Sequence, residues 1–360
     1  MLVAALGIAA CGREAAPDRV VATIGFIFIG AHDDLGYNQA AWEGSEAVAR
    51  AFPEIQVLRV EGVPETSAAV DALEGLISEG ASVVFATSFG HRDFAYEVAE
   101  RHPDVVVFHQ GGVEPSPRLD NFGTYWGNVY EPVFQAGIAA GAATTTDIVG
   151  FVAAFPIPAT FANVNAFTLG ARSVNPDVVT SVRFTGDWCD PVLQAEFAAD
   201  LLAAGADVLS QHQDCTRTIL EAAEAAGAMS VGYHVDGSEV AVNGWLAGAV
   251  WTWGDTFTDM VRRSVDGTFV SSPYNGDFRG RLATGDNPFV ITPFGPSVTS
   301  ETAALMDAAG ERFRGGATPF DGPIVDRDGT VRVPAGTAPD QAEVDAMDYF
   351  VAGVIGDVPE

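Results

Sequence analysis

The sequence contains no lysine, few cysteines and, beyond its N-terminus, no apolar run that approaches the roughly 18 residues of a membrane span. All 18 basic residues are arginines, and they stand against 48 aspartates and glutamates, so the net charge is −30 at pH 7. A charge of this sign repels the phosphates of nucleic acids and anionic lipid surfaces. We therefore expect no nucleic-acid partner.

Only three cysteines occur. The first, Cys11, follows the residues MLVAALGIAA, which resemble a bacterial lipobox, the motif whose cysteine is acylated after export. We expect residues 1–19 to be the remnant of a lipoprotein signal and a tether, and the protein to be exported and lipid-anchored at the extracytoplasmic face of the cell membrane. In that compartment Cys189 and Cys215 can pair as a disulfide, but the sequence leaves the pairing open.

Apolar, strand-like runs alternate with Ala- and Glu-rich helical patterns along most of the chain. The strand-like runs are 22–29, 55–60, 82–87, 104–109, 148–153, 179–185, 206–211 and 229–233. The helical patterns are 38–51, 67–79, 92–101, 131–143, 160–173, 191–204 and 216–226. Strands that alternate with helices of this length form parallel sheets from right-handed βαβ units. Because VVATIGFIFIG and DIVGFVAAFPIP each open a set of four such strands, we predict an α/β protein with two lobes around a cleft.

The last third of the chain departs from this alternation. Residues 245–295 contain the short extended pieces WLAGAVWTW and PFVITPFGP, which we expect to cross back between the lobes. Asp328-Gly329 lies between apolar alternations and predicts a β-hairpin. The closing segment MDYFVAGVIG is expected to form a short amphipathic helix.

Motifs of catalysis are scarce. The sequence has neither a phosphate-binding glycine loop nor a G-x-S-x-G elbow, and its six histidines are dispersed. His212-Gln213-Asp214 offers two metal ligands without a visible third. We therefore expect a binding protein rather than an enzyme, with no metal and no cofactor.

Aromatic residues instead follow several of the predicted strands, at the edge where open α/β sheets bind ligands. These aromatic residues are Tyr37, Phe89, Phe155, Trp188, Trp251 and Trp253. Hydrogen-bonding side chains stand beside them at Asn38, Ser88, Asp190, Asp214, His234 and Asp236. Each aromatic residue alone is more often part of a core than a ligand contact, but together they predict a pocket that grips a planar polar molecule by stacking.

A set of longer motifs carries a family resemblance. These motifs are DDLGYNQAAWEG, VFATSFGH, AAFPIPATFANVNAFTLGARSVNP, WCDP, GADVLSQHQD, GAVWTWGD, ITPFGP and DGTVRVPAG. Together, from about Val21 to Gly356, they resemble the basic membrane protein family of ABC-transporter substrate-binding lipoproteins, and within it the purine nucleoside and nucleobase receptors.

The resemblance implies a type I periplasmic-binding-protein fold, with two Rossmann-like lobes, parallel sheets and three interdomain crossovers. We expect the first lobe at 20–125 and 252–288 and the second lobe at 126–251 and 289–360. The family implies a monomer that captures its ligand by hinge closure and passes it to an ABC permease.

In nucleoside receptors of this family, the purine lies between aromatic rings, and acidic and amide side chains bond its edge and the ribose. Trp188, in the W-C-D-P motif, is expected to be one of the two rings. The opposing ring is expected from the first lobe, with Tyr37 as the first choice and Trp42 as the second. Asn38 and Asp34 match the polar positions of the same loop.

Two positions depart from the family pattern. Nucleoside-binding members tend to show G-x-D-x-D, whereas this chain has GYHVDG, so His234 replaces the first acid and Asp236 keeps the second. Members also tend to carry a lysine in the crossover strand, where this chain has Trp251. Because those acid and lysine positions would hold ribose hydroxyls, and an indole removes three donors, we expect a purine nucleobase rather than a nucleoside.

Other interpretations stay open at this point. The same fold serves sugars and other small polar metabolites. An α/β enzyme that processes purines would use Asp33, Asp34 or His234 as acid or base, although two adjacent carboxylates more often form a solvated turn or a helix cap. A ligand-sensing DNA-binding regulator is opposed by the acidic charge.

Overall fold

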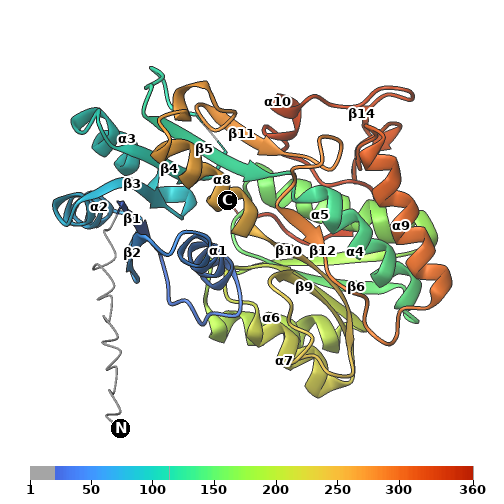
Figure 1. Cartoon of the computed structure of the whole chain (residues 1–360). Helices are drawn as coiled ribbons and strands as arrows, with labels where there is room; N and C mark the ends of the chain where they lie inside the picture. Colours follow the sequence, from blue (N-terminus) through green and yellow to red (C-terminus); the bar gives the residue numbers. More distant parts are fainter. Residues whose placement is uncertain (1–20, 113, 360) are drawn as a thin grey trace, which may run out of the picture.

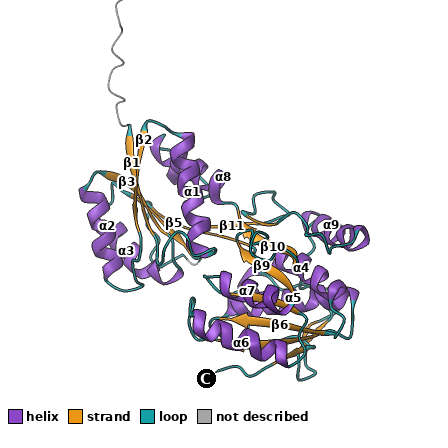
Figure 2. Cartoon of the chain, turned by 90° about the horizontal axis from the view of Figure 1, so that it is seen from below, coloured by secondary structure: helices purple, strands orange, loops and turns teal. Residues whose placement is uncertain are grey.

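The computed structural model describes residues 21–112 and 114–359, which form two large sheets, each covered by helices and each the centre of one lobe, and a two-stranded hairpin (Figures 1 and 2). The first sheet has the order β11-β5-β4-β3-β1-β2, with all neighbours parallel. Its strands are β1 (Ala22–Ile27), β2 (Ile55–Val60), β3 (Ala81–Ala86), β4 (Val106–Gln110), β5 (Phe122–Gly127) and β11 (Asp277–Gly280). Its helices are α1 (Tyr37–Ala51), α2 (Ala68–Ser78), η1 (Phe89–His91), α3 (Arg92–Arg101), α8 (Trp253–Val265) and η2 (Phe269–Ser271).

The second sheet has the order β12-β10-β9-β8-β6-β7-β15, and only β12 runs antiparallel to its neighbour. Its strands are β6 (Ile148–Ala153), β7 (Val179–Phe184), β8 (Val208–His212), β9 (Met229–His234), β10 (Trp245–Trp251), β12 (Phe289–Ile291) and β15 (Val354–Ile355). The second lobe also contains the helices α4 (Tyr130–Ala143), α5 (Pro158–Val174), α6 (Pro191–Ala203), α7 (Arg217–Ala226) and α9 (Ser300–Arg314). Beyond α9 follow the hairpin β13 (Ile324–Val325) and β14 (Val331–Val333), and the short α10 (Gln341–Val344).

The chain passes between the two sheets three times, after β5, after β10 and after β11. The second passage returns the chain to the first lobe, where α8 packs on α1. The lobe boundaries expected from the sequence stay a prediction. In the structure, the strands of the first sheet lie within 22–127 and 277–280. Those of the second sheet occupy 148–291, apart from β11, and 354–355.

The central strands are buried on both faces, as parallel sheets between helices require. In the first lobe the rings of Phe26 and Phe85 stack at 4.4 Å, and Phe108 and Phe257 extend this cluster under α8. The alternation of apolar runs with helices therefore predicted the layers correctly, because burial on both faces needs continuous apolar runs rather than alternating ones.

Three segments test the less regular parts of the sequence pattern. The hairpin around Asp328-Gly329 is confirmed, with Gly329 at φ 87°. The closing helix is wrong, because MDYFVAGVIG instead supplies β15, which pairs with the edge strand β7. Gly353 and Gly356 have positive φ there, which suits a turning edge segment and not a helix. Strand β5 was not anticipated, because FGTYWG carries two glycines and lacks an aliphatic run.

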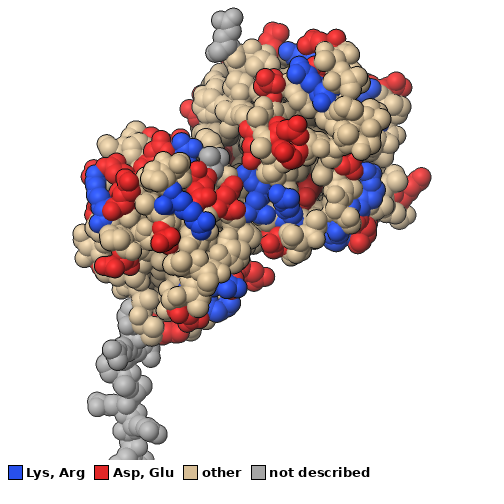
Figure 3. All heavy atoms as spheres, turned by 90° about the horizontal axis from the view of Figure 1, so that it is seen from above, with Lys and Arg blue, Asp and Glu red and all other residues tan. Residues whose placement is uncertain are grey.

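Arginines and carboxylates are interspersed over the face shown in Figure 3, where acidic side chains are spread over both lobes. Several arginines have a carboxylate neighbour, as in the pairs Arg262–Asp259 at 2.8 Å and Arg332–Asp326 at 2.6 Å. Among the described residues, no helix combines the length and the apolar character that a membrane crossing requires.

Helices α4 and α5 approach each other through glycines. A Cβ built on Gly170 would lie 2.1 Å from the carbonyl oxygen of Phe134 on α4. Since that neighbour is backbone, it cannot rotate away. We predict that Gly170→Ala lowers the free energy of unfolding by about 1–3 kcal/mol, measured by urea denaturation.

The control is Gly75→Ala on the exposed side of α2, where no atom lies within 4 Å of an added Cβ. This control should be neutral or stabilise by up to about 1 kcal/mol through helix propensity. A Gly170→Ala variant as stable as the control would contradict the close approach of α4 and α5.

Candidate ligand-binding site

A cavity of about 220 Å³ lies between the lobes, at the carboxyl ends of the parallel strands of both sheets. This is where open α/β sheets receive ligands. The first lobe lines it with Tyr37, Glu65, Ser88, Phe89, Gly111, Trp126 and Arg279. The remaining lining residues are Ile157, Pro158, Ala159, Trp188, His212, Asp214, His234 and Asp345.

Three aromatic rings form the first-lobe wall. Tyr37 begins α1 and is 5% exposed, and its ring centroid lies 6.4 Å from that of Trp126 on β5. Phe89 follows β3, is 48% exposed and borders the cavity. This wall therefore offers flat apolar faces rather than hydrogen-bonding groups.

The polar groups of the same wall are largely engaged with each other. Glu65 Oε1 accepts hydrogen bonds from Ser88 Oγ at 2.6 Å and from the Gly90 amide at 2.7 Å. His109 holds the adjoining turn, because its Nε2 lies 3.1 and 3.0 Å from the carbonyl oxygens of Ser88 and Phe89. Burial lowers the pKa of His109 to about 3, so the ring is neutral in the folded protein.

Trp188 is the aromatic residue of the second-lobe wall. It lies in the loop between β7 and α6, half-buried, with its ring centroid 5.2 Å from that of Phe155 in an edge-on contact. On its other side it lies 5.9 Å from the ring of His212. Phe155 and His212 therefore support Trp188 while one side of the indole borders the cavity.

Asp214 is a carboxyl group of the cavity lining that lacks a hydrogen-bond donor among the described residues, and the Tyr37 hydroxyl and His234 Nε2 beside the same cavity also lack partners. The Asp214 side chain is 13% exposed. Burial, with the nearby negative charges of Asp34 and Glu65, raises the pKa of Asp214 well above its ordinary value. A buried carboxyl group without a donor is poised to accept a hydrogen bond from a ligand.

The backbone next to Asp214 joins the two lobes. Its carbonyl oxygen accepts a hydrogen bond from the Tyr37 amide at 2.9 Å, and Gly36 forms a β-bridge with Cys215. Thr216 Oγ1 donates to the carbonyl oxygen of Leu35. Both lobes are thereby connected directly beside the cavity.

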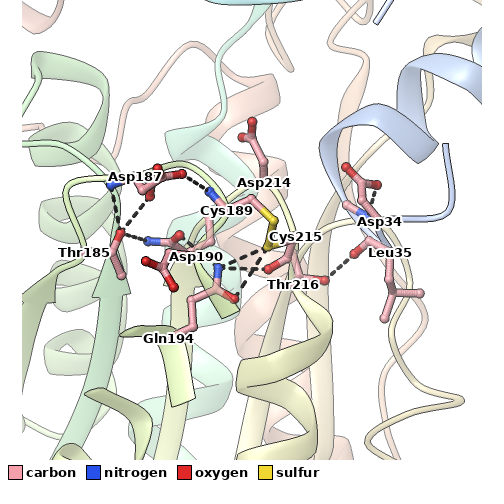
Figure 4. The surroundings of a disulfide bond; sticks show 12 residues. Asp34, Leu35, Thr185, Asp187, Cys189, Asp190, Gln194, Asp214, Cys215 and Thr216 are labelled. Carbon is pink, nitrogen blue, oxygen red and sulfur yellow. Dashed lines mark hydrogen bonds between the residues drawn. A yellow bond between two sulfur atoms is a disulfide. The ribbon is translucent and has the colours of Figure 1, made fainter. Parts of the chain in front are cut away.

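A disulfide between Cys189 and Cys215 ties this contact to the loop of Trp188 (Figure 4). The Asp214 amide also donates to the Trp188 carbonyl oxygen at 2.8 Å. Gln194 donates to the carbonyl oxygen of Cys215 at 3.1 Å. The pairing that the sequence left open is therefore present, and it fixes Trp188 relative to Asp214.

Arg279 and Asp345 lie at another part of the cavity wall. Arg279 Nη2 donates to the Gly112 carbonyl oxygen at 2.8 Å and lies 3.3 Å from Asp345 Oδ2. It is the one arginine that borders the cavity within the described ranges. Arg279 stands against three acidic side chains of the cavity lining, Glu65, Asp214 and Asp345, which disfavours anionic ligands.

The structure brings six of the residues expected from the sequence to the cavity: Tyr37, Ser88, Phe89, Trp188, Asp214 and His234. The other seven do not line it. Of these, Phe155 and Trp251 lie behind the wall, where they contact Trp188 and His234.

The remaining five are engaged elsewhere. Asp34 accepts from the backbone amides of Gly36, Asn38 and Gln39 and caps α1, and Asn38 bonds Asp34 and the Gly30 amide. Trp42 stacks on His32, outside the cavity. Asp190 caps α6, and Asp236 is exposed and accepts from the Ser238 amide.

Glu65, Trp126, Arg279 and Asp345 were not anticipated. Trp126 lies on the strand that the sequence analysis missed, and Arg279 lies on β11, which joins the first sheet from far along the chain. The sequence pattern gives no signal for Asp345, which follows the short α10. Their convergence depends on the crossovers, which no local pattern encodes.

Within residues 21–112 and 114–359, no group of three His, Cys, Asp or Glu side chains could hold a metal ion. The acylation expected at Cys11 lies outside the described residues. Asp33, a candidate acid or base, is exposed and does not border the cavity.

Two lobes with three crossovers and a cavity between them define the type I periplasmic-binding-protein fold. A solved ABC-transporter solute-binding protein from Aeropyrum pernix superposes with a TM-score of 0.71 at 17% identity, covering 90% of this chain and 95% of that one. This likeness confirms the fold.

The family model "ABC transporter substrate-binding protein PnrA-like" matches residues 21–278. The chain therefore belongs to the Bmp family of ABC-transporter substrate-binding proteins, which confirms the resemblance found in the sequence.

Two curated relatives match nearly the whole chain. A putative ABC transporter glucose-binding protein from Haloferax volcanii is 31% identical over 339 residues, covering 93% of this chain and 80% of the relative. A purine-binding protein from Brucella abortus is 29% identical over 339 residues, covering 94% of both chains.

The contact between the lobes generates a first prediction for this site. A Cβ on Gly36 would lie 1.6 Å from the Asp214 carbonyl oxygen, so Gly36→Ala should keep the lobes apart at this point. We expect ligand affinity to fall at least about tenfold. The circular dichroism spectrum of the whole protein should stay unchanged, because the secondary structure of the lobes is unaffected. The change in affinity is measured by calorimetric titration with whichever ligand binds the wild type, with Gly75→Ala as the unaffected control. Unchanged affinity in Gly36→Ala would contradict the role of this contact in closure.

The buried His109 generates a pH prediction. Its folded pKa of about 3 lies below the ordinary 6.5, so between these values the unfolded chain binds one more proton than the folded chain. Its contribution to stability is therefore complete above pH 6.5 and is lost as the pH falls. In urea unfolding between about pH 6 and about pH 5, His109→Gln should reduce the slope of unfolding free energy against pH by up to about 1.4 kcal/mol per unit. Parallel slopes for variant and wild type would show that His109 titrates normally in the fold.

Proposed function

We propose that this substrate-binding protein captures a purine-type heterocycle, a nucleobase in preference to a nucleoside, and delivers it to an ABC permease. The ring is held between Trp188 of the second lobe and Tyr37 of the first, with Trp126 beside Tyr37. The observation that carries the proposal is that flat aromatic side chains of both lobes border one small cavity that holds an unpartnered carboxyl group, Asp214.

The balance of apolar and polar groups supports a heterocycle. Base–aromatic stacking contributes roughly 1–3 kcal/mol per contact and tolerates any flat ring. Because Glu65 and Ser88 are bonded to each other, few polar groups remain to bind a ligand, chiefly Asp214, its neighbour His234 and the Tyr37 hydroxyl. A flat ring with one polar edge fits this distribution.

The volume supports the smaller ligand. About 220 Å³ is less than the roughly 300–1,000 Å³ typical of sites for drug-sized molecules, and a nucleobase is much smaller than a nucleoside. In addition, His234 and Trp251 stand where the family resemblance led us to expect ribose-binding acid and lysine side chains. Neither residue offers the acceptor or the ammonium group that a ribose would need there.

A sugar is the second candidate, because the relative from Haloferax volcanii is named for glucose binding. A monosaccharide also suits a cavity of this volume. It carries hydroxyl groups around its whole rim, however, and each buried hydroxyl without a partner costs roughly 1–3 kcal/mol. The aromatic and aliphatic walls leave most of that rim unmatched.

Closure links binding to transport in this proposal. A ligand that contacts both lobes favours the closed form, in which Tyr37 and Trp188 approach it together. The permease can then distinguish the loaded from the empty protein. Acylation at Cys11 would keep the protein at the membrane face where the permease works.

Calorimetric titration tests the ligand class. We expect adenine, guanine or hypoxanthine to bind at micromolar or tighter Kd, about −8 kcal/mol, and more tightly than adenosine, guanosine or glucose. Trp188→Ala should weaken base binding by about 10- to 100-fold through lost stacking. Trp42→Ala, on a half-buried tryptophan outside the cavity, is the matched control and should leave the affinity within about twofold. Tighter binding of a nucleoside would overturn the base preference, and binding of glucose alone would overturn the purine proposal.

A further inference from the structure

His234 occupies a strained backbone position at the edge of the cavity. It ends β9 with φ of +70°, in the left-handed region that non-glycine residues rarely adopt. Its side chain is 2% exposed. Such a conformation persists where the surroundings hold the residue firmly, and it is common at ligand-binding sites. The groups that hold the ring are therefore informative.

Trp251 fixes one nitrogen of this ring. Trp251 Nε1 lies 3.0 Å from His234 Nδ1, and an indole N–H can only donate, so Nδ1 is the acceptor. Burial, together with the nearby His212, lowers the pKa of His234 well below its ordinary value, so the ring is neutral. A neutral imidazole that accepts at Nδ1 carries its hydrogen on Nε2. Trp251 therefore sets the tautomer of His234, because its indole N–H can donate a hydrogen bond but cannot accept one.

The Nε2–H group of His234 lacks a hydrogen-bond acceptor among the described residues. It is buried, and Asp214 Oδ1 lies 3.8 Å away. A buried N–H without an acceptor costs about 1–3 kcal/mol. A shift of about 1 Å would bring Asp214 to a normal N–H···O distance of roughly 2.9 Å. The carboxyl group and the ring each lack a partner that the other supplies.

We infer that Trp251 and His234 are positioning residues of the ligand site, which orient the Asp214 carboxyl group through a chain of hydrogen bonds from Trp251 Nε1–H to His234 and from His234 Nε2–H to Asp214 Oδ1. Asp214 Oδ2 is then left to accept a ring or exocyclic N–H of the ligand. The inference rests on the proposed function and deepens it: the site takes heterocycles that present an N–H donor at the edge held by Asp214.

The sheet places these two side chains together. His234 ends β9 and Trp251 ends the neighbouring strand β10, where His234 pairs with Val250. The bond between the indole and the imidazole therefore rests on a regular part of the fold, and it supports Asp214 without adding a charge.

Two tryptophans allow a matched test. Trp251→Phe removes the N–H that fixes His234. Trp253→Phe removes an equally buried indole that stacks on Trp251 at 4.4 Å, but its Nε1 has no hydrogen-bond partner in the described structure. With hypoxanthine as the probe, we expect Trp251→Phe to weaken binding by about three- to tenfold and Trp253→Phe by less than about twofold. Equal effects of the two substitutions would assign Trp251 to packing alone and overturn the inference.

A double-mutant cycle separates action through Asp214 from other effects. Asp214→Asn keeps an oxygen for His234 but offers the ligand a donor instead of an acceptor, so binding should fall by about 10- to 100-fold. In the Asp214→Asn background, Trp251→Phe should cost little more. Additive losses would contradict a chain of bonds that ends at Asp214.

The tautomer is measured without any ligand, by proton-nitrogen correlation spectra of the histidine rings. We expect one ring, assigned to His234 by its loss in His234→Asn, to carry its proton on Nε2 in wild type and in Trp253→Phe. Trp251→Phe should release this preference. An Nδ1–H form of His234 in the wild type would overturn the inference, whereas failure of hypoxanthine to bind a protein with the expected tautomer would overturn the proposed function instead.

Discussion

The segment Asp214–Thr216 carries the constraint on which the rest of the site depends. Its backbone reaches the first lobe at Gly36 and Tyr37, and its disulfide holds the loop of Trp188. The side chain of Asp214 faces the cavity from the middle of these attachments. One short stretch thus joins the lobes, holds the loop of Trp188 and places a carboxyl group at the cavity, so in the proposed function closure and recognition are a single event. A ligand that binds the Asp214 side chain is therefore coupled to the contact that the Asp214 backbone makes with the first lobe.

Much of this arrangement could be predicted from the sequence. Continuous apolar runs such as Ile24–Ile27 predicted the buried parallel strands. Aromatic residues after strands predicted the edge of both sheets where the cavity lies, and Tyr37 and Trp188 border that cavity. The polar residues were harder, because a carboxylate after a strand has two common uses. Asp34 and Asp190 serve their own helices as caps, while Asp214 has no donor of the described residues within hydrogen-bonding distance. A carboxylate that caps a helix can be told from one that is open to a ligand only when its hydrogen-bond donors are known from the structure.

Residues contributed by the crossovers were beyond reach of local patterns. Trp126 and Arg279 lie on neighbouring strands of one sheet although about 150 residues separate them in the chain. Their pairing follows from the return of the chain to the first lobe after β10. The resemblance to a transport family supplied that topology, and the family match agrees with it. The bond between Trp251 and His234 beside Asp214 was likewise not indicated by any local pattern.

The central claim is that one planar ring is enclosed by both lobes at once, and a crystal structure of the protein with hypoxanthine tests it most directly. The account predicts the ring between Trp188 and the Tyr37 side of the first lobe, with an N–H of the base on Asp214. A base bound to one lobe only, or bound away from Trp188 with the cavity empty, would contradict it.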